Sequence, residues 1–248
     1  MHWLSLREPV SAWTHGGWAL CALPACLLTW RLCRGDRVKQ LSLLLFGATW
    51  FACFGGSMLY HGVRLSEHGI EICRKIDHAG IYLLIAGTVT PPAVVVLRGR
   101  WRHRTLLFAW GMAAVGIALL VGLPLAPLWT STLVYVTIGW GVCLGYFEMS
   151  RMLPPGAMRP VWLGGLFYSV GALLNVVGWP RLIPGVFSTH ELWHLFGIAG
   201  SLSHLWFMVR WVAPFERGRP VPALSLASEV GSPLPHVAPA MGLDAPLP

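Results

Sequence analysis

Long apolar stretches separated by short polar loops dominate the hydrophobic pattern of this chain. A transmembrane helix needs about 20 consecutive apolar residues, because lipid offers the backbone no hydrogen-bond partners and a helix satisfies its own. Seven stretches reach this length. They cover residues 11–32, 41–62, 78–97, 104–123, 128–148, 160–179 and 189–212. The pattern therefore predicts an all-α, polytopic membrane protein built as a bundle of seven transmembrane helices.

The two ends of the chain carry different signals. Arg7 and the apolar stretch that follows it look like the start of a secretory signal peptide, but no small-residue cleavage site follows that stretch. We therefore expect a retained first helix. The segment from Pro214 onward holds 8 of the 19 prolines, a composition that cannot bury a core. We expect one helical domain over residues 1–213 and a disordered Pro-rich tail over residues 214–248.

Composition supports the membrane class. The chain is 55% hydrophobic and 11% charged, and its mean hydropathy is +0.61. Several tryptophans lie near the predicted helix ends, as in an interfacial belt: Trp13, Trp101, Trp129, Trp179 and Trp211. The net charge of +8 would suit nucleic acid, but the bases cluster in short loops, which is the usual topogenic pattern. No nucleic-acid partner is expected.

The distribution of bases over the loops predicts an orientation. The side that holds the N-terminus carries five: Arg7, Arg64, Arg74, Lys75 and Arg181. The other side carries thirteen: Arg31, Arg34, Arg37, Lys39, Arg98, Arg100, Arg102, Arg104, Arg151, Arg159, Arg210, Arg217 and Arg219. Because loops rich in Lys and Arg stay in the cytoplasm, we expect a cytoplasmic C-terminus and an N-terminus on the opposite side.

Five polar residues stand where an oily segment should hold none: Ser57, His61, Asp77, His190 and His194. The second predicted helix ends, and the third and seventh begin, on the side of the N-terminus. Connectivity alone therefore brings all five into one leaflet. Ionisable residues within a bilayer are costly, so their presence indicates a functional site.

The spacing of these residues points to a metal. His190 and His194 are four residues apart, as are Ser57 and His61, so each pair lies on one helix face. Three imidazoles that converge from two helices suit a tetrahedral zinc ion and leave the fourth position for water, the catalytic arrangement. A carboxylate such as Asp77 would hold that water or orient a ligand imidazole.

Other interpretations of the same residues stay open at this point. Asp77 and Thr189 stand where they could cap their helices. HELWH also matches the H-E-x-x-H pattern of metalloproteases, in which Glu191 would be the general base and His204 the third ligand. His78 follows Asp77 but points about 100° away on a helix, so we expect it not to bind the metal.

Three segments carry a resemblance to a known family. SMLYH, KIDHAGIYLLIAGTVTPP and HELWHLFGIAGS resemble the signature segments of the bacterial hemolysin III family, part of the progestin and adipoQ receptor group. The resemblance covers about residues 5–212 and leaves out the tail. In the family's first motif Glu8 and His15 fall in place, while Ser11 stands where asparagine is usual.

The resemblance implies a zinc ion on His61, His190 and His194, with Ser57 and Asp77 beside it. The wider group includes alkaline ceramidases, which implies a hydrolase of lipid amides or esters in the bacterial plasma (inner) membrane. In that role we expect Asp77 to act as general acid–base and Ser57 to donate a hydrogen bond to the oxyanion.

Two other functions fit the resemblance: a receptor or sensor with structural zinc, and a haemolysin-type lytic or pore protein. No run of charged residues lines any predicted helix, which counts against an ion pathway. The adiponectin receptors of the same group keep their N-terminus in the cytoplasm, which is opposite to the orientation that the base count predicts.

Overall fold

The structure is a computed structural model that describes residues 6–122, 128–141, 145–180, 182–183 and 186–217. Its elements are α1 (Pro9–Leu20), α2 (Ala22–Leu32), α3 (Arg37–Gly62), α4 (Glu67–Val95), α5 (Gly99–Gly122), α6 (Leu128–Gly141), α7 (Tyr146–Met152), α8 (Arg159–Val177), α9 (Thr189–Phe207) and the π-helical turn η2 (Met208–Val212). Apart from an isolated bridge between Ile183 and Phe187, these residues contain no β-structure. The all-α prediction is confirmed.

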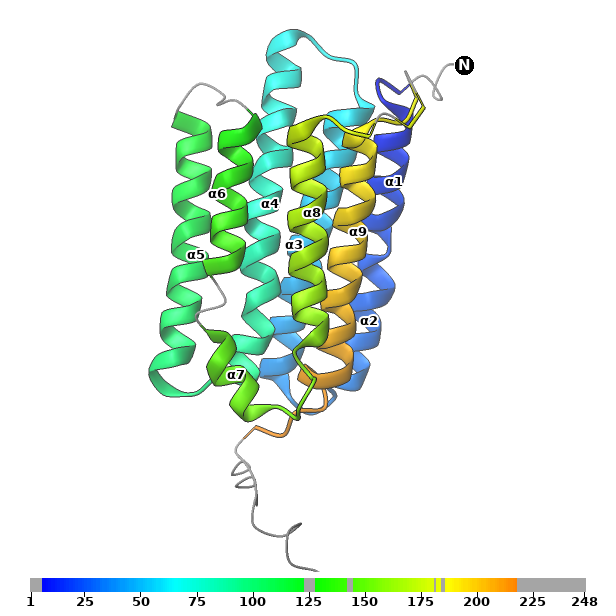
Figure 1. The fold of residues 1–248 in the computed structure, drawn as a ribbon. Coiled ribbons are helices and arrows are strands. Elements are labelled where there is room, and N and C mark those ends of the chain that lie inside the picture. The colour runs from blue at the N-terminus through cyan, green and yellow to red at the C-terminus, as the bar shows by residue number, and fades with distance from the viewer. Residues whose placement is uncertain (1–5, 123–127, 142–144, 181, 184–185, 218–248) are drawn as a thin grey trace, which may run out of the picture. The chain divides into compact units, whose positions relative to one another are not determined.

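The first predicted span is divided in two. α1 and α2 follow one another along the same column (Figure 1), with a break at Cys21, which still has helical dihedral angles. Pro24 explains the position of the break, because proline has no N–H to donate to the carbonyl four residues earlier, that of Leu20. Each half is too short to cross a membrane, but together they cover the predicted range 11–32.

Among the described residues, six further helical segments are long and apolar enough to cross a membrane. Four of the predicted ranges match α3, α5, α8 and the α9–η2 pair to within a few residues. The range 128–148 falls on α6 and α7, with residues 142–144 outside the described part. α4 differs most, because it begins at Glu67, where the Ser66 side chain accepts a hydrogen bond from the Gly69 amide. Asp77 is therefore inside α4 and does not cap it.

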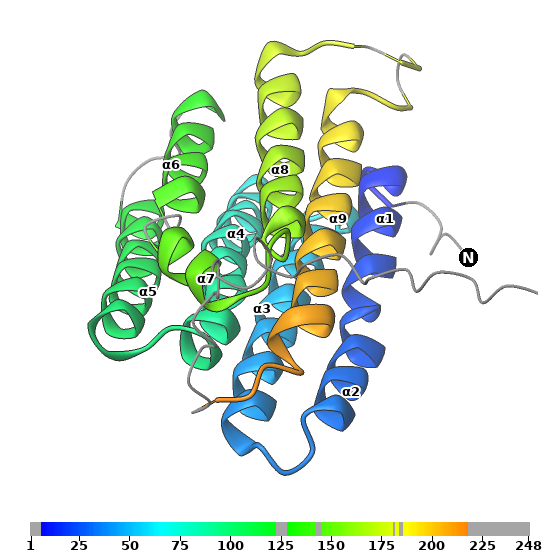
Figure 2. The same cartoon turned by 60° about the horizontal axis from the view of Figure 1, so that its bottom comes forward.

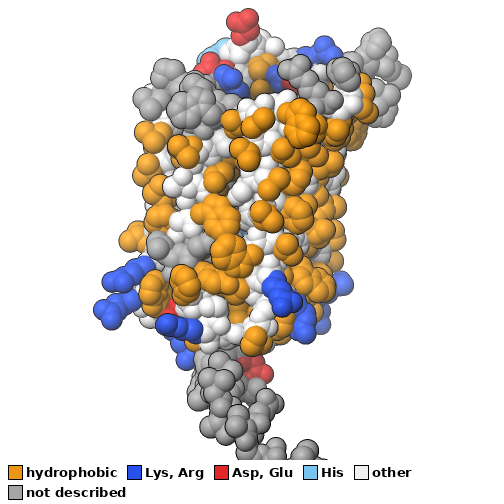
Figure 3. Space-filling view, in the orientation of Figure 1, with side chains coloured by type: hydrophobic (Ala, Val, Ile, Leu, Met, Phe, Trp, Pro, Cys, Tyr) orange, Lys and Arg blue, Asp and Glu red, His pale blue; other side chains and the backbone are white. Residues whose placement is uncertain are grey.

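The outer helices present apolar side chains to their surroundings. Only 22% of the most apolar stretch of α5, and of α8, is buried within the protein, compared with 61% in α4. Figure 3 shows hydrophobic side chains over the sides of the bundle, with Lys and Arg gathered at its ends. Trp13, Trp101 and Trp179 are exposed near helix ends, where an interfacial belt would lie. The chain is an integral membrane protein.

α3 and α4 form the centre of the bundle, with α1, α2 and α9 on one side and α5 and α6 on the other (Figures 1 and 2). The two central helices approach closely at Gly80, where a Cβ would lie 2.7 Å from the Cα of Cys53. Small residues at such crossings let membrane helices pack by van der Waals contact. Trp50, Phe46 and Phe207 fill the core around them.

The end of the bundle opposite the N-terminus is tied together by polar contacts. Lys39 is buried and donates from Nζ to the carbonyl of Ala213 at 2.7 Å. Asp36 accepts two hydrogen bonds from the Arg217 guanidinium, at 2.6 and 3.0 Å. Phe215 packs against the core. Residues 214–217, which the sequence assigned to the tail, thus contact the bundle, and the rest of the predicted tail lies outside the described residues.

Candidate metal centre

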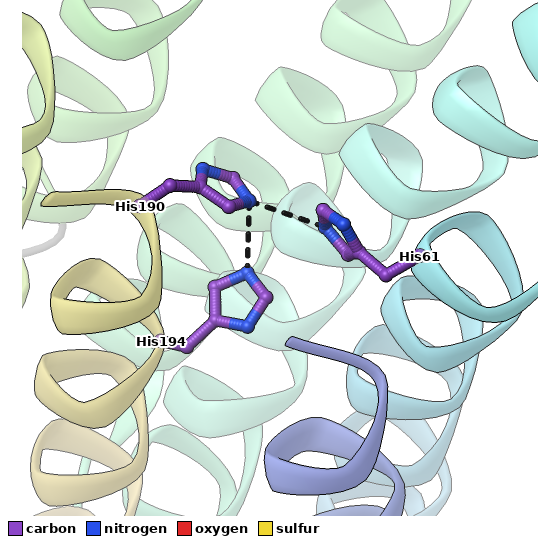
Figure 4. A group of neighbouring side chains, drawn as sticks. All are labelled: His61, His190 and His194. Carbon is purple, nitrogen blue, oxygen red and sulfur yellow. Dashed lines mark hydrogen bonds between the residues drawn. The ribbon is translucent and has the colours of Figure 1, made fainter. Parts of the chain in front are cut away.

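Three histidines meet near the end of the bundle that holds the N-terminus (Figure 4). His61 lies in the last turn of α3, while His190 and His194 lie in the first two turns of α9. Their nearest ring nitrogens are all within 4.8 Å of one another. His61 and His194 are almost fully buried, at 1% and 2% exposure. The structure thus brings together the three residues that the sequence analysis assigned to a metal.

The hydrogen-bond chemistry of the cluster fits a cation. Nε2 of His190 lies 3.2 Å from Nε2 of His61 and 3.1 Å from Nε2 of His194. A neutral imidazole nitrogen either donates or accepts, so Nε2 of His190 cannot satisfy both neighbours. Around a tetrahedral zinc ion with Zn–N distances of 2.0–2.1 Å, such nitrogens would be about 3.3 Å apart. The donor set, and the spacing of the two pairs that include His190, therefore suit zinc.

The start of α9 is fixed by its own cap. Ser188 and Glu191 form a capping box, in which the Glu191 carboxylate accepts from the Ser188 amide at 2.7 Å and from its hydroxyl at 2.6 Å. Ser11 of α1 donates to the same carboxylate at 2.9 Å. Ser188, and not Thr189, is thus the N-cap residue. The cap holds the first turn of α9, and with it His190, in place.

These contacts count against the interpretation of HELWH as the H-E-x-x-H pattern of a metalloprotease. The Glu191 carboxylate is already taken up by Ser188 and Ser11, so it is not free to act as a general base. His204 lies ten residues beyond His194, about 15 Å along the helix axis, and is not part of the cluster. The pattern matches, but His204 is not the third member of the cluster, and Glu191 serves as part of the helix cap.

A cavity of about 230 Å³ begins at the histidines and runs into the bundle. Its polar end is bordered by His190 and His194 from α9, Ser57 from α3 and Asp77 from α4. α3 and α4 pack closely beside these two residues, since a Cβ on Gly56 would lie 3.7 Å from the Cα of Asp77. The remaining lining is mostly aliphatic and aromatic, down to Met208 at the far end of α9. The structure thus brings Ser57 and Asp77 to the same cavity as two of the histidines.

His78 also borders the cavity, although it is not part of the histidine cluster. Its Nδ1 is buried without a hydrogen-bond partner. It faces the cavity together with Asp77 because the cavity is broad enough to meet two adjacent positions of α4. Asp77 and His78 therefore both border the cavity, although a helix separates their directions by about 100°. The place of His78 outside the histidine cluster agrees with the sequence analysis.

Two contacts made by α1 and its N-cap residue were not predicted from the sequence. The Glu8 carboxylate lies 2.5 Å from Nδ1 of His61, and the His15 ring stacks on that of His194 with centroids 3.6 Å apart. The only signal for these residues in the sequence was the partial match of the first motif. Spacing rules could not reveal them, because 53 residues separate Glu8 from His61.

Comparisons with known proteins agree with this geometry. The family model described as Haemolysin-III related matches residues 4–205. A protein named Hemolysin-3 homolog from Bacillus subtilis (strain 168) is 30% identical over 197 residues, which cover 79% of this chain and 89% of that protein. A protein named Hemolysin-3 from Bacillus cereus is 29% identical over 210 residues, covering 84% of this chain and 93% of its own. The chain therefore belongs to the haemolysin-III-related family, within the progestin and adipoQ receptor group.

Proposed function

We propose that this protein is a zinc-dependent hydrolase of the bacterial plasma membrane that cleaves an amide or ester bond of a lipid. One observation carries the proposal. Three imidazoles converge at one end of a mostly apolar cavity, and a carboxyl and a buried hydroxyl border the same end. Metal ligands, a proton carrier and room for an acyl chain thus share one space.

His61, His190 and His194 would hold the zinc ion. Bound there, zinc supplies a Lewis acid and lowers the pKa of a coordinated water from 15.7 towards about 7. Three protein ligands leave one position of a tetrahedral site open, and His190 and His194 both border the cavity. A substrate in the cavity would therefore lie next to two of the three residues that would hold the metal.

Asp77 carries the proton in this proposal. Its carboxylate takes the proton that the attacking water gives up and later gives it to the leaving amine or alcohol, the two-way role of a general acid–base. The residue sits inside α4, half-buried, and borders the same cavity as Ser57. A carboxyl held on a rigid helix keeps the proton close to the reacting bond.

Ser57 has two successive roles. Both residues border the cavity, so the Ser57 hydroxyl would donate to the Asp77 carboxylate and orient it while Asp77 is ionised. Once Asp77 has taken up the proton, the carboxylic acid donates to Ser57 instead, and the serine hydrogen is free to turn towards the substrate oxyanion. Removing a donor of this kind typically costs about 2.7–4 kcal/mol of transition-state stabilisation.

The rest of the cavity suits a fatty-acyl chain. The lining beyond Asp77 comes from α4, α6, α8 and α9 and is dominated by apolar side chains such as Ile81, Ile85 and Val161. An acyl chain in this space places its carbonyl at the polar end, beside the histidines. The same apolar lining argues against an ion-conducting pore, because the ionisable residues do not line a continuous path among the described positions.

The experiment is product detection. Full-length protein, purified in detergent and loaded with zinc, is incubated with a panel of lipid amides and esters, and released fatty acid is measured by mass spectrometry. We expect release from at least one substrate class and loss of release after chelation of the metal. Zinc-bound protein that releases no fatty acid from any member of the panel would overturn the hydrolase and favour a sensor with structural zinc.

A further inference from the structure

One face of the first helix touches the metal-bearing helices at every turn. Ser11, His15 and Trp18 follow one another at intervals of three or four residues and share a face of α1, and the N-cap residue Glu8 directly precedes the helix. Glu8 contacts His61, Ser11 contacts Glu191, and His15 stacks on His194. Trp18 donates from its indole N–H to Ser201 at 2.8 Å. These residues, 8, 11, 15 and 18, are called the α1 stripe below.

Glu8 is the member of the α1 stripe that contacts a metal-ligand candidate by a hydrogen bond. Its Oε2 lies 2.5 Å from Nδ1 of His61. The backbone holds it in register, since the Glu8 amide donates to the His61 carbonyl at 2.9 Å and the Arg7 amide donates to the Gly62 carbonyl at 3.3 Å. Three hydrogen bonds thus join residues 7 and 8, at the start of α1, to residues 61 and 62, at the end of α3.

The pairing decides which nitrogen of His61 is free. A neutral imidazole has one N–H, and a carboxylate can only accept, so the hydrogen is on Nδ1 and the lone pair is on Nε2. Nε2 is the atom that faces His190, at 3.2 Å. Carboxylates in this position fix the tautomer and the ring plane of a metal-binding histidine and raise its basicity.

The other two histidines lack such a partner. Nδ1 of His194 is buried and reaches the backbone of Ser11 only in poor hydrogen-bond geometry, while the ring is held by its stacking on His15. In the part of the chain that the structure describes, Glu8 is the only carboxylate paired with any of the three imidazoles. The orienting effect is therefore concentrated on His61.

We propose that Glu8 is the positioning residue of the metal centre, holding His61 with Nε2 directed at the metal. This inference rests on the zinc site of the proposed function. The rest of the α1 stripe docks the helix against α9, and Glu8 adds an electrostatic effect that docking alone does not provide. The two contributions differ in what they change: docking changes thermal stability, whereas Glu8 changes metal affinity.

The test measures zinc affinity of the full-length protein in detergent by competition with a chelator. Glu8→Ala is expected to weaken zinc binding about 10–100-fold, the usual effect of losing such a partner. Glu8→Gln, which keeps an acceptor oxygen but no charge, should fall between Glu8→Ala and wild type. Glu8 is 41% exposed, so neither variant leaves a buried void.

Two matched controls separate positioning from general docking. Trp18→Phe removes the hydrogen bond of the same α1 stripe to Ser201, which is neither a candidate ligand nor part of the α9 cap. It should lower the melting temperature of the metal-free protein and leave zinc affinity unchanged. Glu67→Ala removes an exposed carboxylate at the start of α4, at the same end of the bundle, and should change neither.

The outcomes are distinguishable. If wild-type protein binds no zinc, the metal site of the proposed function fails, and the role of Glu8 fails with it. If wild type binds zinc and Glu8→Ala binds it equally well, only the role of Glu8 is refuted. Equal losses of affinity in Trp18→Phe and Glu8→Ala would also refute it, because docking of α1 would then account for both.

Discussion

His61 is fixed from two directions, by the Glu8 carboxylate at Nδ1 and by the fold of α3, which buries its ring. His190 depends instead on the capping box that starts α9, and His194 on the stacked ring of His15. Each ligand of the candidate centre therefore has its own support. Loss of one support should disturb one ligand and leave the other two in place.

Asp77 and Ser57 give the sharpest test of chemistry at single residues. Asp77→Asn should retain zinc and abolish turnover of any lipid found to be a substrate, because the amide cannot take up a proton from water. Ser57→Ala should slow turnover by about 10²–10³-fold, as loss of an oxyanion donor does. Fatty-acid release and bound zinc are measured on the same samples. Turnover by Asp77→Asn close to that of wild type would remove Asp77 from the mechanism.

At the residue scale, helix spacing predicted the histidine cluster but not its surroundings. His190 and His194 share a helix face by their i, i+4 spacing, and the direction of successive helices brought His61 to the same leaflet. Glu8 and Ser11 act across 53 and 180 residues of sequence, and no spacing rule reaches that far. Capping was also misplaced, because a one-residue shift from Thr189 to Ser188 is within the uncertainty of any helix boundary.

At the scale of elements, hydrophobicity predicted the helix ends well where the helix is as long as its apolar stretch. It failed for α4, which continues beyond its apolar stretch. α4 extends eleven residues before its predicted start at residue 78, because the polar sequence after Ser66 forms a helix beyond the apolar part. Hydropathy cannot detect this extension, since a helix outside the hydrocarbon layer needs no apolar residues. The break at Cys21, by contrast, follows from Pro24 and was open to prediction.

The contact between the α2–α3 connection and Arg217 provides a pH-dependent prediction. Burial opposes ionisation of Asp36, but the Lys39 amide and the Arg217 guanidinium hold the pKa of its carboxyl below its ordinary value of 3.8. A lowered pKa means that the ionised carboxylate stabilises the folded protein above pH 3.8, and that this stabilisation is lost as the pH falls through the folded-state pKa.

Asp36→Asn should therefore lower the melting temperature at pH 7 by about 1–4 °C, a modest amount because the ion pair is partly exposed. Asparagine still caps α3, so the loss reports the ion pair and not the cap. The difference from wild type should shrink as the pH falls below 3.8. A difference that is equally large in acid would show that charge on Asp36 is not its cause.

For the whole molecule, the base count predicts that the end of the bundle opposite the candidate metal centre lies in the cytoplasm. Most of the described arginines at that end are exposed, including Arg31, Arg34, Arg100 and Arg151, and Figure 3 shows basic side chains gathered there. In the predicted orientation the candidate metal centre would face away from the cytoplasm, and a substrate would reach it from the outer leaflet.

Reporter fusions test this orientation. A reporter that is active only in the periplasm should be inactive when fused at Pro214 or at Arg98, between α4 and α5, and active when fused at Leu65, between α3 and α4. The physical reason is the retention of arginine-rich segments in the cytoplasm. Activity at Pro214 and Arg98, with none at Leu65, would reverse the orientation and place the candidate metal centre on the cytoplasmic side.

The zinc site itself is tested most directly by zinc K-edge X-ray absorption on the purified, full-length protein. The account predicts one zinc ion per chain with three imidazole nitrogens at about 2.0–2.1 Å. His61→Ala, His190→Ala and His194→Ala should each lose most of the metal, while His78→Ala and His204→Ala keep it. Zinc that is bound through sulfur, or that survives the loss of His61 with an unchanged spectrum, would contradict the account.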